Sequence, residues 1–166
     1  MAILIGKNQD EWPEIRKDLR KELEDFKEKY IQIFHEADYN RYLNILDWQS
    51  GGCSSDKWLV MPFMGTLIAN TFNRPVYFFS SLQSYTIPPQ RTPPSDIAPI
   101  SFFLVGAHYN VLKLTQNCPL PPIYPAWESS ANDEAKPWKG FLNERIKRYE
   151  RIVEDINLNN LLDLDD

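Results

Sequence analysis

The chain has 166 residues, 43% of them apolar, which suits one compact domain with its own hydrophobic core rather than a disordered segment. The formal net charge is −5, and no block of lysine and arginine stands clear of acidic neighbours, which argues against a nucleic-acid partner. No apolar run approaches the roughly 20 residues that cross a membrane, so we expect no membrane association, and the first residues are too short an apolar run for a signal peptide.

The sequence holds two cysteines, Cys53 and Cys118. Two cysteines are too few for a disulfide framework, and no cluster of cysteine and histidine has the spacing of a zinc site. We therefore expect no metal and no cofactor. A reducing compartment, the cytoplasm or the nucleus, fits this cysteine usage best.

Three helices are predicted in the first half of the chain. Apolar residues at spacings of three and four predict an amphipathic helix over residues 11–34 and a shorter one over 38–46. A third helix is predicted over residues 56–72, with Trp58, Met61 and Met64 on its inner face, and Asn73 and Pro75 end it. Trp12, Trp58 and Trp138 fall on apolar faces and are predicted to be core residues.

Strands follow the helices. β-Branched and aromatic residues predict strands over 76–79, 100–105 and 108–114, and Gly106-Ala107 predicts a tight turn that makes the last two an antiparallel hairpin. A proline-rich connector over 88–99 precedes the hairpin, and we expect it to cross the surface or to form a mobile loop. An amphipathic helix that begins near Trp138 closes the domain.

This order of elements predicts an α+β domain with a small, mostly antiparallel sheet packed against helices. We predict one domain over residues 1–157 and an acidic, frayed tail over residues 158–166.

The most informative candidate site residue is His108, at the start of the last predicted strand. Side chains two positions apart in a strand lie on one face, so His108 and Asn110 point the same way. An asparagine amide can hold an imidazole in one tautomer, which suits a general base and its orienting partner. The simpler interpretation, a polar residue at a strand start, stays open on spacing alone.

Two stretches of the sequence resemble the ovarian-tumour (OTU) family of papain-type cysteine proteases, which act as deubiquitinases. One runs from Trp58 to Asn70 and continues into Asn73-Arg-Pro-Val-Tyr-Phe-Phe; the other runs from Pro99 through His108-Tyr-Asn. The resemblance covers residues 3–127. Within the family, the chain is most similar to OTU domains of fungal and transposon-associated proteins. It implies that His108 and Asn110 are two members of a catalytic triad.

The chain departs from this family at the nucleophile. The family's cysteine lies in an Asp-Gly-Asn-Cys-like motif at a helix N-terminus, which this sequence does not contain. That helix commonly ends in an apolar stretch like Ile3-Leu4-Ile5-Gly6, so we expect a domain that is truncated at its N-terminus. Cys53 follows two glycines and could serve as a replacement only after rearrangement of the fold, and Cys118 is more consistent with packing or surface exposure.

Two functional hypotheses follow from the resemblance. In the first, the parent domain is a cysteine deubiquitinase, this chain is inactive without its nucleophile, and Gly106, Ala107 and Tyr109 flank a channel for the ubiquitin tail. In the second, the chain is a non-catalytic pseudoenzyme that binds ubiquitin, ubiquitin chains or another protein. The loss of a centrally packed helix further predicts that the chain is marginally stable or self-associates through the face that the helix leaves uncovered.

Overall fold

The computed structural model describes residues 5–48 and 54–162. The order of elements in this part of the chain confirms an α+β domain, with helices, then strands, then helices. The elements are η2 Gln9–Glu11, α1 Trp12–Asp25, α2 Lys27–Leu46, η3 Ser55–Lys57, α3 Phe63–Phe72, β1 Val76–Ser80, β2 Tyr85–Ile87, β3 Ile100–Val105, β4 His108–Val111, α4 Pro125–Ser130 and α5 Trp138–Leu162.

The four strands form one mixed sheet in the order β2-β1-β3-β4. β2 pairs antiparallel with β1, and β4 pairs antiparallel with β3, but the central pair β1 and β3 is parallel. Two of the three strand pairs are thus antiparallel, in agreement with the predicted mostly antiparallel sheet, and the parallel central pair makes the sheet mixed. The parallel pair arises because β2 returns the chain to the end of the sheet where β1 begins, and residues 88–99 then cross to β3, which starts beside the same residue, Val76.

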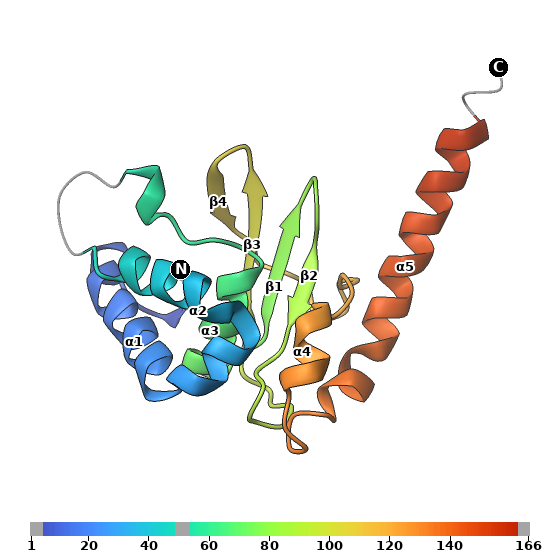
Figure 1. Ribbon diagram of the computed structural model, residues 1–166. Helices are drawn as coiled ribbons and strands as arrows, with labels where there is room; N and C mark the ends of the chain where they lie inside the picture. Colours follow the sequence, from blue (N-terminus) through green and yellow to red (C-terminus); the bar gives the residue numbers. More distant parts are fainter. Residues whose placement is uncertain (1–4, 49–53, 163–166) are drawn as a thin grey trace.

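The sheet is covered on both faces, which gives the molecule three layers (Figure 1). On one face Val76, Phe78 and Phe102 pack with α1, α2 and α3 in the larger core. On the other face Tyr77 packs with α4, with the start of α5 and with the 112–124 crossing in a smaller core. Strand alternation produces this division, since neighbouring residues of β1 point to opposite faces.

The predicted helix over residues 11–34 is wrong in one respect, because the structure breaks it at Phe26 (φ −117°, ψ 32°). An unbroken helix of that length would extend about 36 Å and carry its second half away from the sheet. The break turns α2 back, so that Tyr30 and Phe34 enter the core. The predicted boundary between residues 34 and 38 coincides with a kink at His35, whose φ is 65°.

The predicted helix over residues 56–72 is confirmed only from Phe63 onward. Residues 58–61 form no helix, because Pro62 lacks a backbone N–H and disfavours helical geometry in the residue before it. The inner-face prediction for Trp58 is therefore wrong, since this side chain is 41% exposed. The end of the helix is as predicted, with Asn73 in the left-handed conformation (φ 49°).

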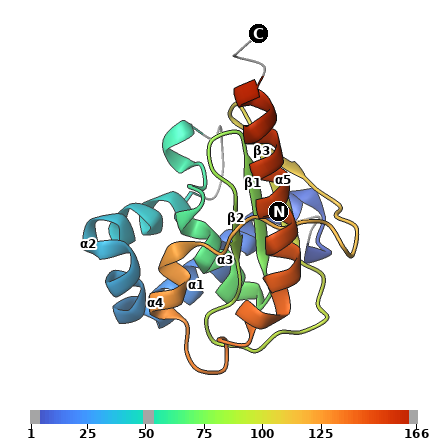
Figure 2. The same ribbon diagram turned by 90° about the vertical axis from the view of Figure 1, so that its right-hand side faces the viewer.

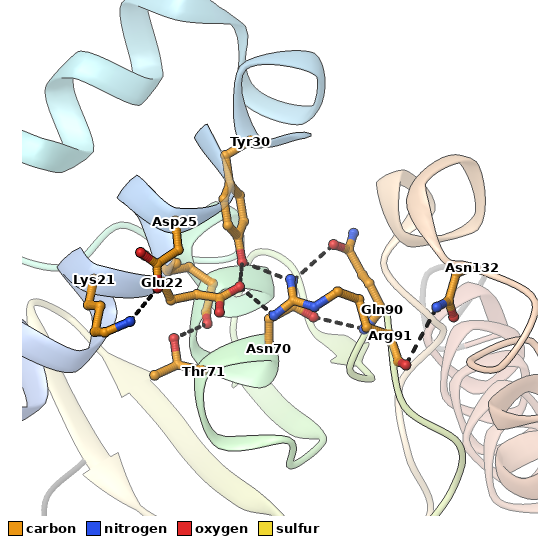
Figure 3. A network of polar contacts seen from close by, with 10 residues as sticks. Lys21, Glu22, Asp25, Tyr30, Asn70, Thr71, Gln90, Arg91 and Asn132 are labelled. Atoms are coloured by element: carbon orange, nitrogen blue, oxygen red, sulfur yellow. Dashed lines mark hydrogen bonds and ion pairs between the residues drawn. The ribbon is translucent and has the colours of Figure 1, made fainter. Parts of the chain in front are cut away.

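A buried polar network holds the proline-rich connector against the helices (Figure 3). The Asn70 amide donates to the Tyr30 hydroxyl at 2.9 Å and to the Gln90 side-chain oxygen at 3.0 Å, and it accepts from the Gln90 backbone N–H at 2.8 Å. Arg91 forms an ion pair of 2.6 Å with Glu22. The start of the connector is therefore buried, not a mobile loop.

α5 packs by its first half only. Trp138 and Leu142 are buried against the sheet, whereas the second half extends past the other elements (Figures 1 and 2). The helix reaches Leu162, beyond the predicted boundary at residue 157. No helix in residues 5–48 and 54–162 is both long and apolar enough to cross a bilayer.

Candidate functional site

The β3–β4 hairpin carries the candidate site. Val105 pairs with His108 across the turn, so Gly106 and Ala107 are its two central residues, as predicted. Gly106 adopts φ 57°, a left-handed conformation that glycine reaches without steric cost. The turn therefore fixes the register of β4, and with it the position of His108 at the first residue of the strand.

His108 and Asn110 lie on the same face of β4, as the sequence predicts, and both are exposed. They occupy the face opposite to Tyr109 and Val111. Tyr109 contacts the rings of Phe78 and Phe102 on the α1–α3 side of the sheet, with centroids 6.5 and 5.9 Å apart. The side chains of His108 and Asn110 therefore point to the other face of the sheet, the face on which the start of α5 packs against β1.

The contact between these two residues differs from the one that would orient a general base. The Asn110 side-chain nitrogen donates to the backbone oxygen of His108 at 3.3 Å. Within the described part of the chain, no hydrogen bond joins the Asn110 amide to the His108 ring. The structure thus brings the two residues together on one face, and among residues 5–48 and 54–162 no side chain forms a hydrogen bond with the imidazole.

Tyr109 forms one wall of an apolar pocket that the sequence did not predict. Its hydroxyl donates to the Leu59 backbone oxygen at 3.1 Å, and burial raises the pKa of this phenol, so the hydroxyl stays protonated as a donor. The pocket has a volume of about 110 Å³ and is lined by Leu59, Met61, Ile68, Phe102, Tyr109, Asn110 and Val111. The sequence feature that could have indicated this pocket is the apolar run before Pro62, which the prediction assigns to a helix.

Of the two cysteines, the structure describes only Cys118. Cys118 is half-buried on the 112–124 crossing, where its sulfur lies 3.4 Å from the Pro119 oxygen and its own carbonyl accepts from Arg145 at 2.8 Å. This position agrees with a packing role. Cys53 lies outside the described residues, so its suggested role as a substitute nucleophile stays a prediction. The described residues include no group of three acidic, histidine or cysteine side chains that could hold a metal ion.

The chemistry available here is that of an exposed base on an edge strand. β4 is the last strand of the sheet order, so one row of its backbone N–H and C=O groups has no strand beside it in the described structure. A neutral imidazole can accept a proton from a thiol that comes within about 3 Å. The edge can also receive an extended peptide, whose apolar side chain would reach the pocket beside Tyr109.

No family model, no curated protein and no solved structure matches this chain.

Proposed function

We propose that this chain is an OTU-like module of the cysteine deubiquitinase class, which receives the C-terminal tail of ubiquitin at the β3–β4 turn and does not hydrolyse the isopeptide bond alone. His108 is the general base of the parent site and Asn110 its orienting partner. Gly106, Ala107 and Tyr109 flank the channel for the tail.

One observation carries this proposal: His108 and Asn110 share a face of β4 immediately after a tight glycine turn. The order of elements also agrees, since α3 leads into β1 and a later hairpin delivers the histidine. A narrow turn of small residues suits a ubiquitin tail, which ends in glycines and admits little side-chain bulk. Hydrolysis is not expected, because the sequence contains no Asp-Gly-Asn-Cys motif to supply a thiolate.

A second candidate is a non-catalytic module that binds ubiquitin or another protein. The contact from Asn110 to the His108 backbone favours it, since the amide does not orient the ring. The two candidates differ in the bound state. In the first, a bound tail turns Asn110 toward the imidazole and fixes one tautomer, which ring ¹⁵N chemical shifts detect; in the second, the ring keeps a mixture of tautomers.

Calorimetric titration with ubiquitin tests the shared claim of tail binding. Intact ubiquitin is expected to bind, and ubiquitin without its C-terminal tail is expected to bind at least about tenfold more weakly, a loss of about 1.4 kcal/mol. Tyr109→Ala should weaken binding similarly, because it opens the wall of the channel. Lys113→Ala, a change just beyond the strand, is the matched control.

A ubiquitin probe with a thiol-reactive C-terminus tests the absence of hydrolysis. We expect no labelling and no cleavage of ubiquitin chains. Labelling at Cys53 or Cys118 would show that the active site lies elsewhere. Cleavage that survives the double change Cys53→Ala and Cys118→Ala would refute the cysteine mechanism altogether. Failure of intact ubiquitin to bind would refute the first candidate and the ubiquitin-binding form of the second.

A further inference from the structure

The second half of α5 carries an apolar strip that the domain does not cover. Along this helix the apolar residues follow one another at alternating spacings of four and three: Leu142, Ile146, Tyr149, Val153 and Ile156. This spacing keeps them on one face of a helix and is the repeat of helices that pair side by side. The strip begins at Leu142, which is buried against the sheet, and continues outward from it.

Exposure rises along the strip toward the C-terminal end. Ile146 is half-buried, Val153 is 37% exposed and Ile156 is 52% exposed. Ile152, which flanks the strip, is 46% exposed. Isolated exposed apolar residues are ordinary, but a continuous strip on a helix that projects from the domain is typical of an interaction surface (Figures 1 and 2).

The charges along α5 are polarised. Residues 145–151 include four basic side chains, Arg145, Lys147, Arg148 and Arg151, against the single acid Glu150. Residues 152–162 of the same helix include two acidic side chains, Glu154 and Asp155, and no basic one. Two copies of this helix side by side in opposite directions therefore bring each basic segment next to an acidic one, whereas parallel copies bring like charges together.

We propose that two copies of this chain pair through the second halves of their α5 helices, in an antiparallel arrangement with the Tyr149, Val153 and Ile156 strip at the centre. The self-complementary strip and the polarised charges identify a second copy as the occupant. From Tyr149 to Leu162 the helix rises about 20 Å, so the contact is a small interface and a weak, concentration-dependent dimer is expected. This proposal is independent of ubiquitin binding.

Sedimentation velocity of the full chain over a range of about 1–500 µM tests it, since a small interface corresponds to dissociation constants between micromolar and millimolar. Wild type is expected to shift from monomer to dimer within this range. Val153→Glu with Ile156→Glu should weaken the association at least about tenfold, because it buries charges without partners. Both sites are exposed, so the variant should keep the thermal transition of the wild type.

Asn143→Glu is the matched control for adding negative charge, because this exposed residue of α5 lies outside both the apolar strip and the basic and acidic segments. A chain that stays monomeric throughout, or a dimer that the Val153→Glu and Ile156→Glu changes leave intact, would overturn the proposal. The second result would point to another surface, such as the face expected to lack a helix.

The orientation has its own test. The changes Glu154→Gln and Asp155→Asn neutralise the two acidic side chains. In an antiparallel dimer they remove the attraction to the basic segment of the second copy, so the dissociation constant is expected to rise a few-fold. The same changes would relieve repulsion in a parallel dimer, so tighter association would overturn the antiparallel arrangement.

Discussion

Trp58 and Trp138 have the same side chain in different surroundings. Trp138 is 1% exposed at the start of α5, and its indole N–H donates to the Thr92 oxygen at 2.9 Å. Trp58 lies in a non-helical stretch before Pro62 and is 41% exposed. The aromatic ring of Trp138 therefore contributes burial and a hydrogen bond to the smaller core, whereas Trp58 contributes little to stability.

Substituting these two tryptophans should separate their roles. Trp138→Ala is expected to lower the free energy of unfolding by about 3–5 kcal/mol, since it leaves a cavity and an unpaired carbonyl. Trp58→Ala is expected to lower it by less than about 1 kcal/mol. Urea denaturation followed by circular dichroism measures both, and equal losses would contradict the exposed position of Trp58.

Asn70 is the residue on which the buried network depends. Its amide makes three buried hydrogen bonds, to Tyr30 and to both the side chain and the backbone of Gln90. Asn70→Ala should therefore cost about 2–4 kcal/mol, because it leaves the Gln90 backbone N–H without a partner. Asn143→Ala on the exposed side of α5 is the control, with an expected change below about 0.5 kcal/mol. A loss at Asn70 no larger than the control's would mean that the network is not stabilising.

At this scale the sequence could predict which side chains share a face but not which atoms meet. Strand alternation is enough to predict that His108 and Asn110 point the same way. The hydrogen bond from Asn110 to the His108 backbone depends on a rotamer, which spacing does not determine. The inner-face prediction for Trp58 is wrong because it extends helical periodicity across Pro62, although proline is the strongest local signal against a helix.

Among the elements, α3 packs closely against β2 because of a glycine. A Cβ atom built on Gly65 would lie 2.3 Å from the Ile87 side chain and 2.8 Å from the end of Met61. Both distances are shorter than any ordinary contact, so a larger residue at position 65 would force the ends of the Ile87 and Met61 side chains to move within the core.

Gly65→Ala is therefore expected to destabilise the protein by about 1–3 kcal/mol. Gly140→Ala is the matched control, because a Cβ atom at that position would have nothing within 4 Å and alanine favours an exposed helix by about 0.5–1 kcal/mol. The two variants should shift the melting temperature in opposite directions, measured by differential scanning calorimetry. A stabilised Gly65→Ala protein would contradict the close approach of α3 and β2.

Elements with a strong local signal were predictable and the others were not. β1 and β3 are rich in β-branched and aromatic residues, and the β3–β4 turn contains its glycine, so their positions follow from local preferences. The break at Phe26 involves neither glycine nor proline; it follows from tertiary packing, including the Arg91 guanidinium 3.9 Å from the Phe26 ring centroid. β2 has only three residues, too few for a periodic pattern.

For the molecule as a whole, buried tyrosines link stability to alkaline pH. Burial raises the pKa of Tyr42 to about 12 and raises that of Tyr30 further. Ionisation is easier in the unfolded chain, whose tyrosines titrate near pH 10. The contribution of these tyrosines to the free energy of unfolding is therefore fully present below about pH 10. Above that pH the free energy of unfolding falls, by up to about 1.4 kcal/mol per pH unit for each such tyrosine.

Tyr42→Phe should reduce this loss, because it removes one of the groups that resists ionisation in the folded state. The free energy of unfolding, measured by urea titration between pH 8 and 11.5, is expected to fall less steeply above about pH 10 in the variant than in the wild type. Identical slopes would mean that Tyr42 is accessible to solvent in the folded protein.

The α+β class followed from the order of predicted elements, whereas the parallel central pair did not, because strand pairing between distant segments has no local signature. The same limit applies to the function. Residue types and spacing identify a histidine and an asparagine on one strand face, but they do not identify the ligand, which is proposed above.

The central claim, recognition of a ubiquitin tail at the β3–β4 hairpin, is tested most directly by residue-resolved NMR. The ¹⁵N-labelled chain would be titrated with ubiquitin, and separately with ubiquitin lacking its C-terminal tail. The account predicts dose-dependent shifts at residues 106–111, which the tail-less protein does not produce. No shifts, shifts confined to other elements, or equal shifts from both ligands would contradict it.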